Sequence, residues 1–324
     1  MKPEIRNTET CRAQYIYDQF KDRASRDDEF HDWAGYRDRL TEFVTCCVPA
    51  GGSLLILGAG KCNDLDLRKL SEHCGSITLS DYRPETAEEA FRQYGLAPGE
   101  NLNFAEADYV GITDDDYLEY TDLLLRTMEK LATQQDPDTT MEKLAGSELN
   151  ALTECLERIY RDNADYKIDL GGAADDAGAP YDNAVITGVH SQLNNSFRGL
   201  FQYVRKDLED RGKKIAFPES LNNAIFQTTR KHTEKLVNRF NEAIFSAVRE
   251  GVVYGYEKNI IYTPKGATAP VIGTVDGARQ AGEAIADLAA EKTLDCIWPL
   301  SRRRGIKFTM SISYLTLPFP VDTI

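Results

Sequence analysis

Two glycines follow a short apolar run early in the chain. Gly58 and Gly60 flank Ala59 and come directly after residues 54–57, which read Leu-Leu-Ile-Leu. Glycine permits a tight turn and lets the backbone approach a bound molecule closely. The pattern predicts a cofactor-binding turn at the end of a buried strand, although glycine pairs are also common in turns that bind nothing.

Acidic residues stand at the ends of the next two apolar runs. Asp81 comes about twenty residues after the glycine turn, where a carboxylate can accept hydrogen bonds from both hydroxyls of a ribose. Asp108 ends the third run, and Tyr82 and Tyr109 directly follow the two carboxylates. We expect all four residues to line a cofactor site. The alternatives are a helix cap for Asp81, ahead of Arg83, and an ordinary turn residue for Asp108.

The residue three positions after the second glycine distinguishes two classes of cofactor. A dinucleotide-binding turn, G-x-G-x-x-G, has its third glycine here, because the following helix must pack close to the strand beside the pyrophosphate. This chain has Asn63 instead. The sequence therefore favours a cofactor without a pyrophosphate, with Asn63 or its neighbour Asp64 as a polar contact to it. A nicotinamide-dependent oxidoreductase that uses the same turn is the alternative.

One histidine follows a fourth apolar run. Residues 183–188 read Asn-Ala-Val-Ile-Thr-Gly, and His190 comes two positions after Gly188. A histidine at such a strand end can act as a general base toward a hydroxyl or an amine. Its alternative role is to hydrogen-bond the backbone near a cofactor. A serine-hydrolase elbow, G-x-S-x-G, is excluded because Val189 stands two positions before Ser191.

Metal chemistry has little support in the sequence, and we expect no metal site. The four histidines do not follow H-x-H or H-E-x-x-H spacing. The seven cysteines contain no C-x-x-C pair, and their odd number argues against a complete disulfide framework. Buried, reduced thiols are the expected state.

The composition indicates a globular protein with a sizeable core. Of 324 residues, 42% are hydrophobic and 28% are charged, and no apolar run reaches the length of a membrane span. The first six residues carry mixed charge and lead into no apolar stretch, so we expect no secretory signal and a cytoplasmic location. The formal net charge of −14 disfavours nucleic acid and anionic membranes as partners. A small-molecule or peptide substrate is the expected partner, and the oligomeric state stays open.

The elements that must position these residues alternate between strands and helices. Strands are predicted at residues 53–57, 76–80, 101–107 and 183–189, and helical segments separate the first three. This alternation is typical of right-handed parallel βαβ units. The carboxyl ends of parallel strands meet at one edge of a sheet, so the glycine turn, the two carboxylates and the histidine are expected to lie along that edge.

Two helical segments lie outside this alternation. The first precedes the first strand, and the second, residues 113–181, contains no good strand. We therefore expect an N-terminal helical cap at residues 1–47. A Rossmann-like cofactor-binding domain is expected at residues 48–324, interrupted by the helical insertion at about 113–181.

The C-terminal part has a different pattern. A strand at residues 252–256 and a helix at 276–290 are followed by two predicted strands, at 294–300 and 306–317, with a short basic turn between them. Two strands joined by such a turn form an antiparallel hairpin.

The glycine turn, the three strand ends, the helical preface and the terminal hairpin together resemble the class I S-adenosylmethionine-dependent methyltransferase superfamily. The resemblance covers most of residues 48–112 and 181–324 and is sharpest at 53–82. It implies an α/β fold: a Rossmann-like, seven-stranded, mostly parallel sheet with a C-terminal antiparallel hairpin. It also implies S-adenosylmethionine as the cofactor and a small-molecule or peptide-like methyl acceptor.

The resemblance implies a role for each strand end. The turn at Gly58 and Gly60 would lie under the methionine part of the cofactor, Asp81 would hold its ribose and Asp108 would contact its adenine. The strand end at Gly188 would lie beside the transferred methyl group.

Two departures from the superfamily pattern stand at the glycine turn. Ile56 occupies a position where many members have an acidic residue, and Cys62 occupies one where many have a third glycine. These departures keep a non-catalytic, S-adenosylmethionine-binding module as an alternative to a methyltransferase.

Overall fold

A computed structural model describes most of the chain. The described ranges are residues 6–22, 29–99, 101–133, 141–170, 180–214, 218–264, 267–301 and 304–317.

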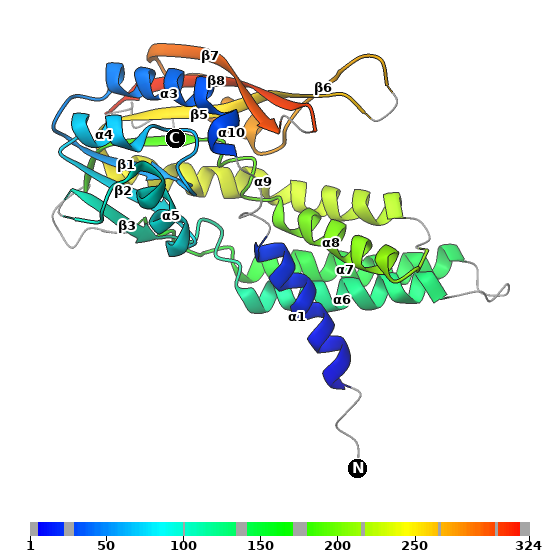
Figure 1. Ribbon diagram of the computed structural model, residues 1–324. Coiled ribbons are helices and arrows are strands. Elements are labelled where there is room, and N and C mark those ends of the chain that lie inside the picture. The colour runs from blue at the N-terminus through cyan, green and yellow to red at the C-terminus, as the bar shows by residue number, and fades with distance from the viewer. Residues whose placement is uncertain are drawn as a thin grey trace. The chain divides into compact units, whose positions relative to one another are not determined.

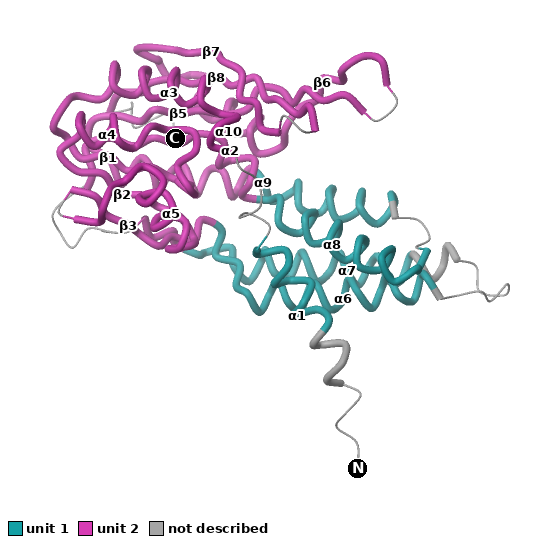
Figure 2. Tube along the Cα trace, viewed as in Figure 1, with its two compact units in different colours: residues 1–27, 110–166, 194–233 teal, residues 28–109, 167–193, 234–324 magenta. Residues whose placement is uncertain are grey.

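The chain forms two compact units, which Figure 2 colours separately. Unit 1 contains Met1–Asp27, Val110–Tyr166 and Asn194–Thr233, and unit 2 contains Asp28–Tyr109, Lys167–Leu193 and Glu234–Ile324. Each unit contains residues from more than one stretch of the chain. The expected division into a helical cap at residues 1–47 and a cofactor-binding domain at 48–324 stays a prediction.

Unit 1 is a bundle of helices. Its elements are α1 (Arg6–Lys21), α6 (Asp114–Thr133), α7 (Met141–Asp162), α8 (Ser196–Asp210) and the first part of α9 (Pro218–Ala247). Leu152, Leu156 and Ile159 recur at helical spacing on α7 and are all fully buried. The ring of Phe197 packs edge-on against Tyr120, with 4.9 Å between the ring centroids. The apolar stripes of the helices therefore form the core of this unit.

Unit 2 is built on one mixed sheet. Its strands are β1 (Ser53–Leu57), β2 (Ser76–Asp81), β3 (Leu102–Glu106), β4 (Tyr181–Thr187), β5 (Val248–Tyr262), β6 (Val271–Gly273), β7 (Ala290–Ser301) and β8 (Ile306–Thr316). The strand order is β3-β2-β1-β4-β5-β8-β7, and the short β6 pairs with β5 beside this path. Strands β1 to β5 pair in parallel, whereas β8 is antiparallel to both β5 and β7 (Figure 1).

Helices cover the sheet of unit 2. They are α2 (Glu29–Asp32), α3 (Ala34–Cys47), α4 (Leu67–His73), α5 (Pro84–Tyr94), α10 (Ala278–Ala284) and the last part of α9. One core joins side chains of α3, α4 and α5 to apolar residues of β1, β2 and β8. Residues 54–57 of β1 are each at most 2% exposed, because a central parallel strand is covered on both faces.

Two expected elements differ from the structure. Strand β5 runs from Val248 to Tyr262, well beyond the expected 252–256, and the expected helix at 276–290 is only α10, Ala278–Ala284. Residues 290–294 instead belong to β7 and pair with residues 312–315 of β8. Residues 290–293 remain exposed, so the pairing with β8 stabilises this segment through its backbone hydrogen bonds and not through burial of these side chains.

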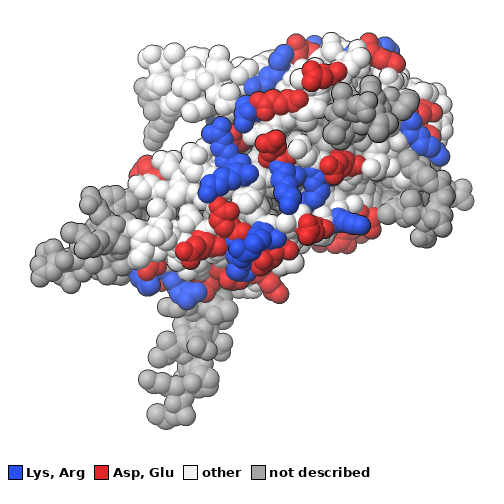
Figure 3. All heavy atoms as spheres, turned by 180° about the vertical axis from the view of Figure 1, so that it is seen from behind, with Lys and Arg blue, Asp and Glu red and all other residues white. Residues whose placement is uncertain are grey.

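Charged side chains of both signs are interspersed on the face shown in Figure 3. Within unit 1, Arg158 pairs with Glu119 at 2.5 Å and Lys231 pairs with Glu157 at 2.9 Å. Such exposed pairs each contribute about 0–1 kcal/mol.

The part of the chain that the structure describes shows three further properties. The cysteines at positions 46, 47, 62, 74, 155 and 296 are free thiols. No group of three or more His, Cys, Asp or Glu side chains among the described residues is arranged to hold a metal ion. None of the described helices combines the length and the apolar character needed to cross a membrane.

Candidate functional site

The turn after β1 has a left-handed backbone at alternate residues. The φ angles are +62° at Gly58, +49° at Gly60 and +54° at Cys62. A Cβ atom on Gly58 would come within 2.4 Å of Cγ2 of Val189, so this glycine is required both by its backbone and by its neighbour. Cys62 therefore has a left-handed backbone conformation that favours glycine, at a cost of about 1–2 kcal/mol.

Asp81 connects the end of β2 to the glycine turn. Its Oδ2 accepts a hydrogen bond of 2.8 Å from the Gly60 N–H, and its Oδ1 accepts one of 3.3 Å from the Arg83 N–H. Burial raises the pKa of this carboxyl group, and the backbone N–H donors partly offset the rise. Helix α5 begins at Pro84 with Arg83 as its N-cap, so Asp81 is not the cap of that helix.

Tyr109 lies against the same turn from the end of β3. Its hydroxyl oxygen accepts a hydrogen bond of 3.0 Å from the Gly58 N–H and donates one of 2.8 Å to the carbonyl oxygen of Ser80. Its ring packs on Phe240 of α9, with 4.8 Å between the centroids. The structure thus brings the glycine turn, Asp81 and Tyr109 together at one edge of the sheet.

The other expected cofactor residues of this edge are arranged differently. Asp108 is partly buried two residues beyond the end of β3, and the side chain of Tyr82 is 44% exposed directly after β2. The side chain of Asn63 is held by α5, because its Oδ1 accepts a hydrogen bond of 3.1 Å from Nε2 of Gln93. In this conformation Asn63 is turned toward that helix.

The first turn of α4 is already occupied by a carboxylate of the chain. Asp66 is the N-cap, and its Oδ1 accepts hydrogen bonds from the N–H groups of Arg68 and Lys69 at 3.1 and 3.2 Å. In a dinucleotide-binding fold these N–H groups receive the pyrophosphate. The negative charge of Asp66 therefore opposes a pyrophosphate at this helix.

His190 is fully buried after the end of β4. Its Nε2 lies 2.9 Å from Oδ1 of Asn241 and 2.9 Å from the hydroxyl of Tyr254, and its Nδ1 is buried with no hydrogen-bond partner among the described residues. Burial lowers its pKa to about 4. The imidazole is therefore neutral at pH 7. Its assignment as a general base stays a prediction.

A second polar group lies at the end of β4 and beside Glu257, which is within β5. Thr187 donates a hydrogen bond of 2.9 Å to Oδ2 of Asp64, and Ser191 donates one of 2.6 Å to Oε1 of Glu257. Between them, Gly188 has a φ of +68°, and a Cβ on it would approach the indole ring of Trp298 to 2.7 Å and Oε1 of Glu257 to 3.5 Å.

The sequence analysis missed Glu257 as a site residue. A signal for it was present, because Glu257 is a single acidic residue at the end of the apolar, β-branched and aromatic run at 252–256. A charged residue inside a buried strand is rarely tolerated without a partner or a role. The predicted strand ended at residue 256, so Glu257 was expected to lie outside the sheet and its charge was not recognised as unusual.

The environment of the two carboxyl groups in this second polar group disfavours their charged forms. Burial raises the pKa of both Asp64 and Glu257. Glu257 is 1% exposed, and its Oε2 has no hydrogen-bond partner among the described residues. A buried polar atom without a partner costs about 1–3 kcal/mol.

Trp298 and Tyr36 lie near these carboxyl groups, and Trp33 packs against Trp298. The ring of Trp298 lies 5.0 Å from that of Trp33, edge to face, and 5.8 Å from that of Tyr36, stacked. The Nε1 atoms of both tryptophans are buried without a hydrogen-bond partner in the described structure. The Tyr36 hydroxyl lies beside Thr187 and makes no hydrogen bond of normal geometry.

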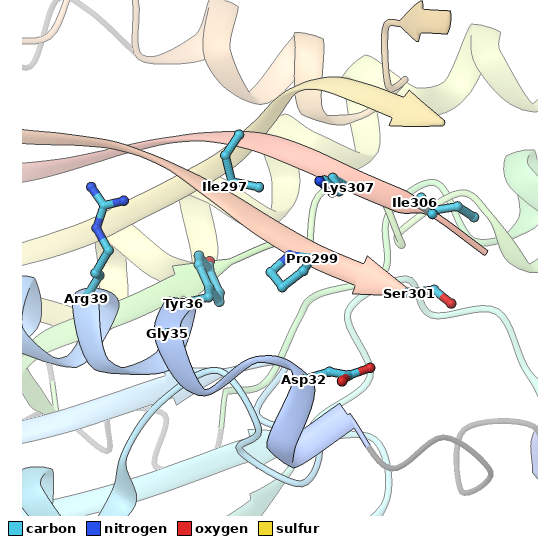
Figure 4. A pocket seen from close by; sticks show the side chains of 10 residues that line it. Asp32, Gly35, Tyr36, Arg39, Ile297, Pro299, Ser301, Ile306 and Lys307 are labelled. Atoms are coloured by element: carbon cyan, nitrogen blue, oxygen red, sulfur yellow. The ribbon is translucent and has the colours of Figure 1, made fainter. Parts of the chain in front are cut away.

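Tyr36 also lines an open pocket between α2, α3 and the β7–β8 hairpin, shown in Figure 4. The pocket has a volume of about 490 Å³. Its lining residues are Asp32, Gly35, Tyr36, Arg39, Ile297, Pro299, Ser301, Gly305, Ile306 and Lys307. Tyr36 therefore belongs to both the pocket and the buried group around Glu257.

The strand order around this site decides the fold. The order β3-β2-β1-β4-β5 is that of a doubly wound dinucleotide-binding sheet, but the sixth parallel strand is replaced by the antiparallel β8, which a hairpin from β7 inserts next to β5. The fold is that of the class I methyltransferases. The fold class expected from the sequence is confirmed, with the short β6 as an addition.

Comparisons with known proteins give only distant likenesses. No protein-family model matches this sequence, and no curated protein matches it. Among solved structures, the chain is similar to the N-methyltransferase NodS from Bradyrhizobium japonicum WM9 in complex with S-adenosyl-L-homocysteine. The identity is 10%, the TM-score is 0.42, and 94% of this chain and 99% of that chain are covered.

The chain is also similar to magnesium protoporphyrin IX methyltransferase ChlM from Synechocystis PCC 6803 with bound S-adenosylmethionine. The identity is 10%, the TM-score is 0.37, and 96% and 100% of the two chains are covered. The glycopeptide N-methyltransferase MtfA follows with 9% identity, a TM-score of 0.32 and coverage of 86% and 89%. At these identities and TM-scores the likenesses do not assign the fold, and the assignment rests on the strand order.

Proposed function

We propose that this protein is an S-adenosylmethionine-dependent methyltransferase that acts on a small-molecule or peptide-like acceptor. The observation that carries the proposal is the pairing of the left-handed glycine turn with Asp81 at one edge of a methyltransferase-type sheet. This arrangement supplies a close backbone approach next to a carboxylate suited to a ribose.

The residues of this edge fit the cofactor. Asp81 would hold the ribose hydroxyls, Asp108 would contact the adenine, and the turn at Gly58 and Gly60 would lie under the methionine part. The bound cofactor would supply a methyl group on a positively charged sulfur, which a nucleophile can take. The end of β4, at Gly188, would face that methyl group.

The residues of the chain itself contribute alignment and the exclusion of water. Methyl transfer can proceed by the alignment of nucleophile and sulfonium, so no base is compulsory. His190 is buried, neutral and held by Asn241 and Tyr254. We therefore infer that His190 positions the segment after β4, whereas its role as a base stays a prediction.

Nicotinamide-dependent oxidoreduction is the weaker candidate. Asp66 already caps the N–H groups of α4 that a pyrophosphate would need, and Asn63 replaces the third glycine of the dinucleotide turn. A non-catalytic module that only binds S-adenosylmethionine is the other candidate. A methyltransferase and a binding module would use the same cofactor turn, so an assay of methyl transfer to an acceptor separates the two.

We also infer a cytoplasmic location and a partner other than nucleic acid. The free state of the six described thiols supports a reducing compartment. The net charge of −14 opposes binding to a phosphate backbone.

Isothermal titration of the full chain with S-adenosylhomocysteine tests the proposal. We expect binding of S-adenosylhomocysteine and none of NAD. In Asp81→Asn, loss of the charged hydrogen bonds to the ribose should weaken binding by at least about tenfold. The exposed Asp287→Asn serves as the matched control and should bind as the parent does. No binding by the parent protein would contradict the proposal.

A further inference from the structure

An acidic and aromatic cluster, largely buried, lies at the end of β4 and around Glu257 within β5. We define the Glu257 cluster as Glu257, Asp64, Trp33, Tyr36 and Trp298. All five residues belong to unit 2, and Gly188 and its neighbours in sequence contact members of the cluster from the end of β4.

Glu257 is the central residue of this cluster. Its Oε1 accepts the hydrogen bond from Ser191, whereas Oε2 is buried and without a partner among the described residues. The pairing of β5 with β8 has a register shift between Glu257 and Asn259. Such bulges redirect side chains and are common next to active sites. One carboxylate oxygen of Glu257 is therefore held in place, and the other is buried with its hydrogen-bonding capacity unused by the described residues.

No described lysine or arginine forms an ion pair with Glu257. Arg37 of α3 lies nearer to Asp64, and its Nη1 is used by the carbonyl oxygens of Phe30 and Asn63. The negative charge of a buried carboxylate is costly unless a cation or several donors compensate it. The cluster therefore has the electrostatic character of a site for a positively charged or strongly donating ligand.

The aromatic residues fit such a ligand as well. Trp298 contacts both Trp33 and Tyr36, and tryptophan and tyrosine rings attract an ammonium group through their faces. The pocket of about 490 Å³ shares Tyr36 with the cluster and offers space for the body of a small molecule (Figure 4). A ligand with an amine and a flat apolar body matches both parts.

We propose that the Glu257 cluster binds the acceptor through an amine, with the amine nitrogen on Oε2 of Glu257 and the aromatic rings around it. This inference rests on the proposed methyltransferase function and names the acceptor class of that site as small organic amines. An acceptor with a carboxylate in the same position is repelled by Asp64 and Glu257.

Three fluorinated probes of similar shape and different charge test the inference. Binding of 4-fluorobenzylamine, 4-fluorobenzyl alcohol and 4-fluorophenylacetate to the full chain is measured by ¹⁹F NMR, with and without S-adenosylhomocysteine. We expect the amine to bind at least about tenfold more tightly than the alcohol, and the acid to bind least.

Substitutions in the full chain then locate the site. Glu257→Gln should reduce the preference for the amine by about tenfold while the titration with S-adenosylhomocysteine is unchanged. Asp64→Asn should reduce it less, because Arg37 already compensates part of that charge. Glu291→Gln, at an exposed carboxylate of β7, is the matched control and should leave the preference intact.

The inference is overturned when the alcohol binds the parent protein as tightly as the amine, or when folded Glu257→Gln binds the amine like the parent. If Glu257→Gln does not fold, the order of the three probes on the parent and on Asp64→Asn decides. Failure of S-adenosylhomocysteine to bind overturns the proposed function instead, and the probe order without it still tests the amine site.

Discussion

Two backbone N–H groups of the glycine turn are hydrogen-bonded to side chains of the chain itself. Gly58 donates to Tyr109 and Gly60 donates to Asp81. These bonds hold the turn in its left-handed conformation before any cofactor binds. The proposed cofactor site is therefore preformed, and a ribose would share the carboxylate of Asp81 with Gly60.

His190 gives a pH prediction at the same scale. Its pKa of about 4 in the folded protein lies below the ordinary histidine value of 6.5, so the unfolded chain binds the proton more readily between these pH values. The part of the free energy of unfolding that depends on neutral His190 is fully present above pH 6.5. It falls by up to about 3 kcal/mol as the pH decreases toward 4 and below.

Urea unfolding at several pH values checks this prediction. In His190→Gln the free energy of unfolding should lose this part of its pH dependence, so the difference between parent and variant should shrink as the pH falls from 7 to 4. The carboxyl groups of Asp64 and Glu257 have raised pKa values and act in the opposite direction, but they are common to both proteins. A difference that does not change with pH would contradict the neutral state of His190.

At the scale of elements, the turn after β1 packs against the segment after β4, and this contact depends on Gly58. In Gly58→Ala the new methyl group meets Val189 at 2.4 Å on a left-handed backbone, whereas in Gly60→Ala it meets nothing within 4 Å. Both variants should be less stable than the parent, Gly60→Ala by about 1 kcal/mol and Gly58→Ala by about 2–3 kcal/mol. Thermal and urea unfolding measure the two losses.

The double variant Gly58→Ala with Val189→Ala isolates the steric part of the loss. If the two single-variant losses of stability were additive, their sum would give the loss of the double variant. We expect the double variant to be about 1 kcal/mol more stable than that sum predicts, because Val189→Ala removes the clash. Strict additivity of the two substitutions would show that the turn does not pack against Val189.

At the scale of the whole molecule, the cofactor residues all belong to unit 2, although unit 1 interrupts that unit twice in sequence. Hydrogen exchange with and without saturating S-adenosylhomocysteine should therefore show increased protection at residues 58–63, 81–83 and 108–109. The fragments of α1 and α7 should change less, since binding stabilises the unit that makes the contacts. Protection confined to unit 1 would contradict the placement of the site.

The local pattern of residues determined the strands, the turn and their order along the chain. A buried parallel strand, a left-handed glycine and a carboxylate at a strand end each leave a signal within a few residues, so β1 to β4, Gly58 and Asp81 could be predicted. The antiparallel hairpin was predicted as well, because its two strands are adjacent in sequence.

Only the tertiary structure decided how distant segments combine. The length of β5 and the early start of β7 depend on pairing with β8, and the Glu257 cluster joins residues of α3, the turn after β1, β5 and β7. The burial of His190 between Asn241 and Tyr254 likewise depends on α9 and β5. Burial and charge compensation are properties of neighbours in space, and a local pattern of apolar and polar residues does not carry them.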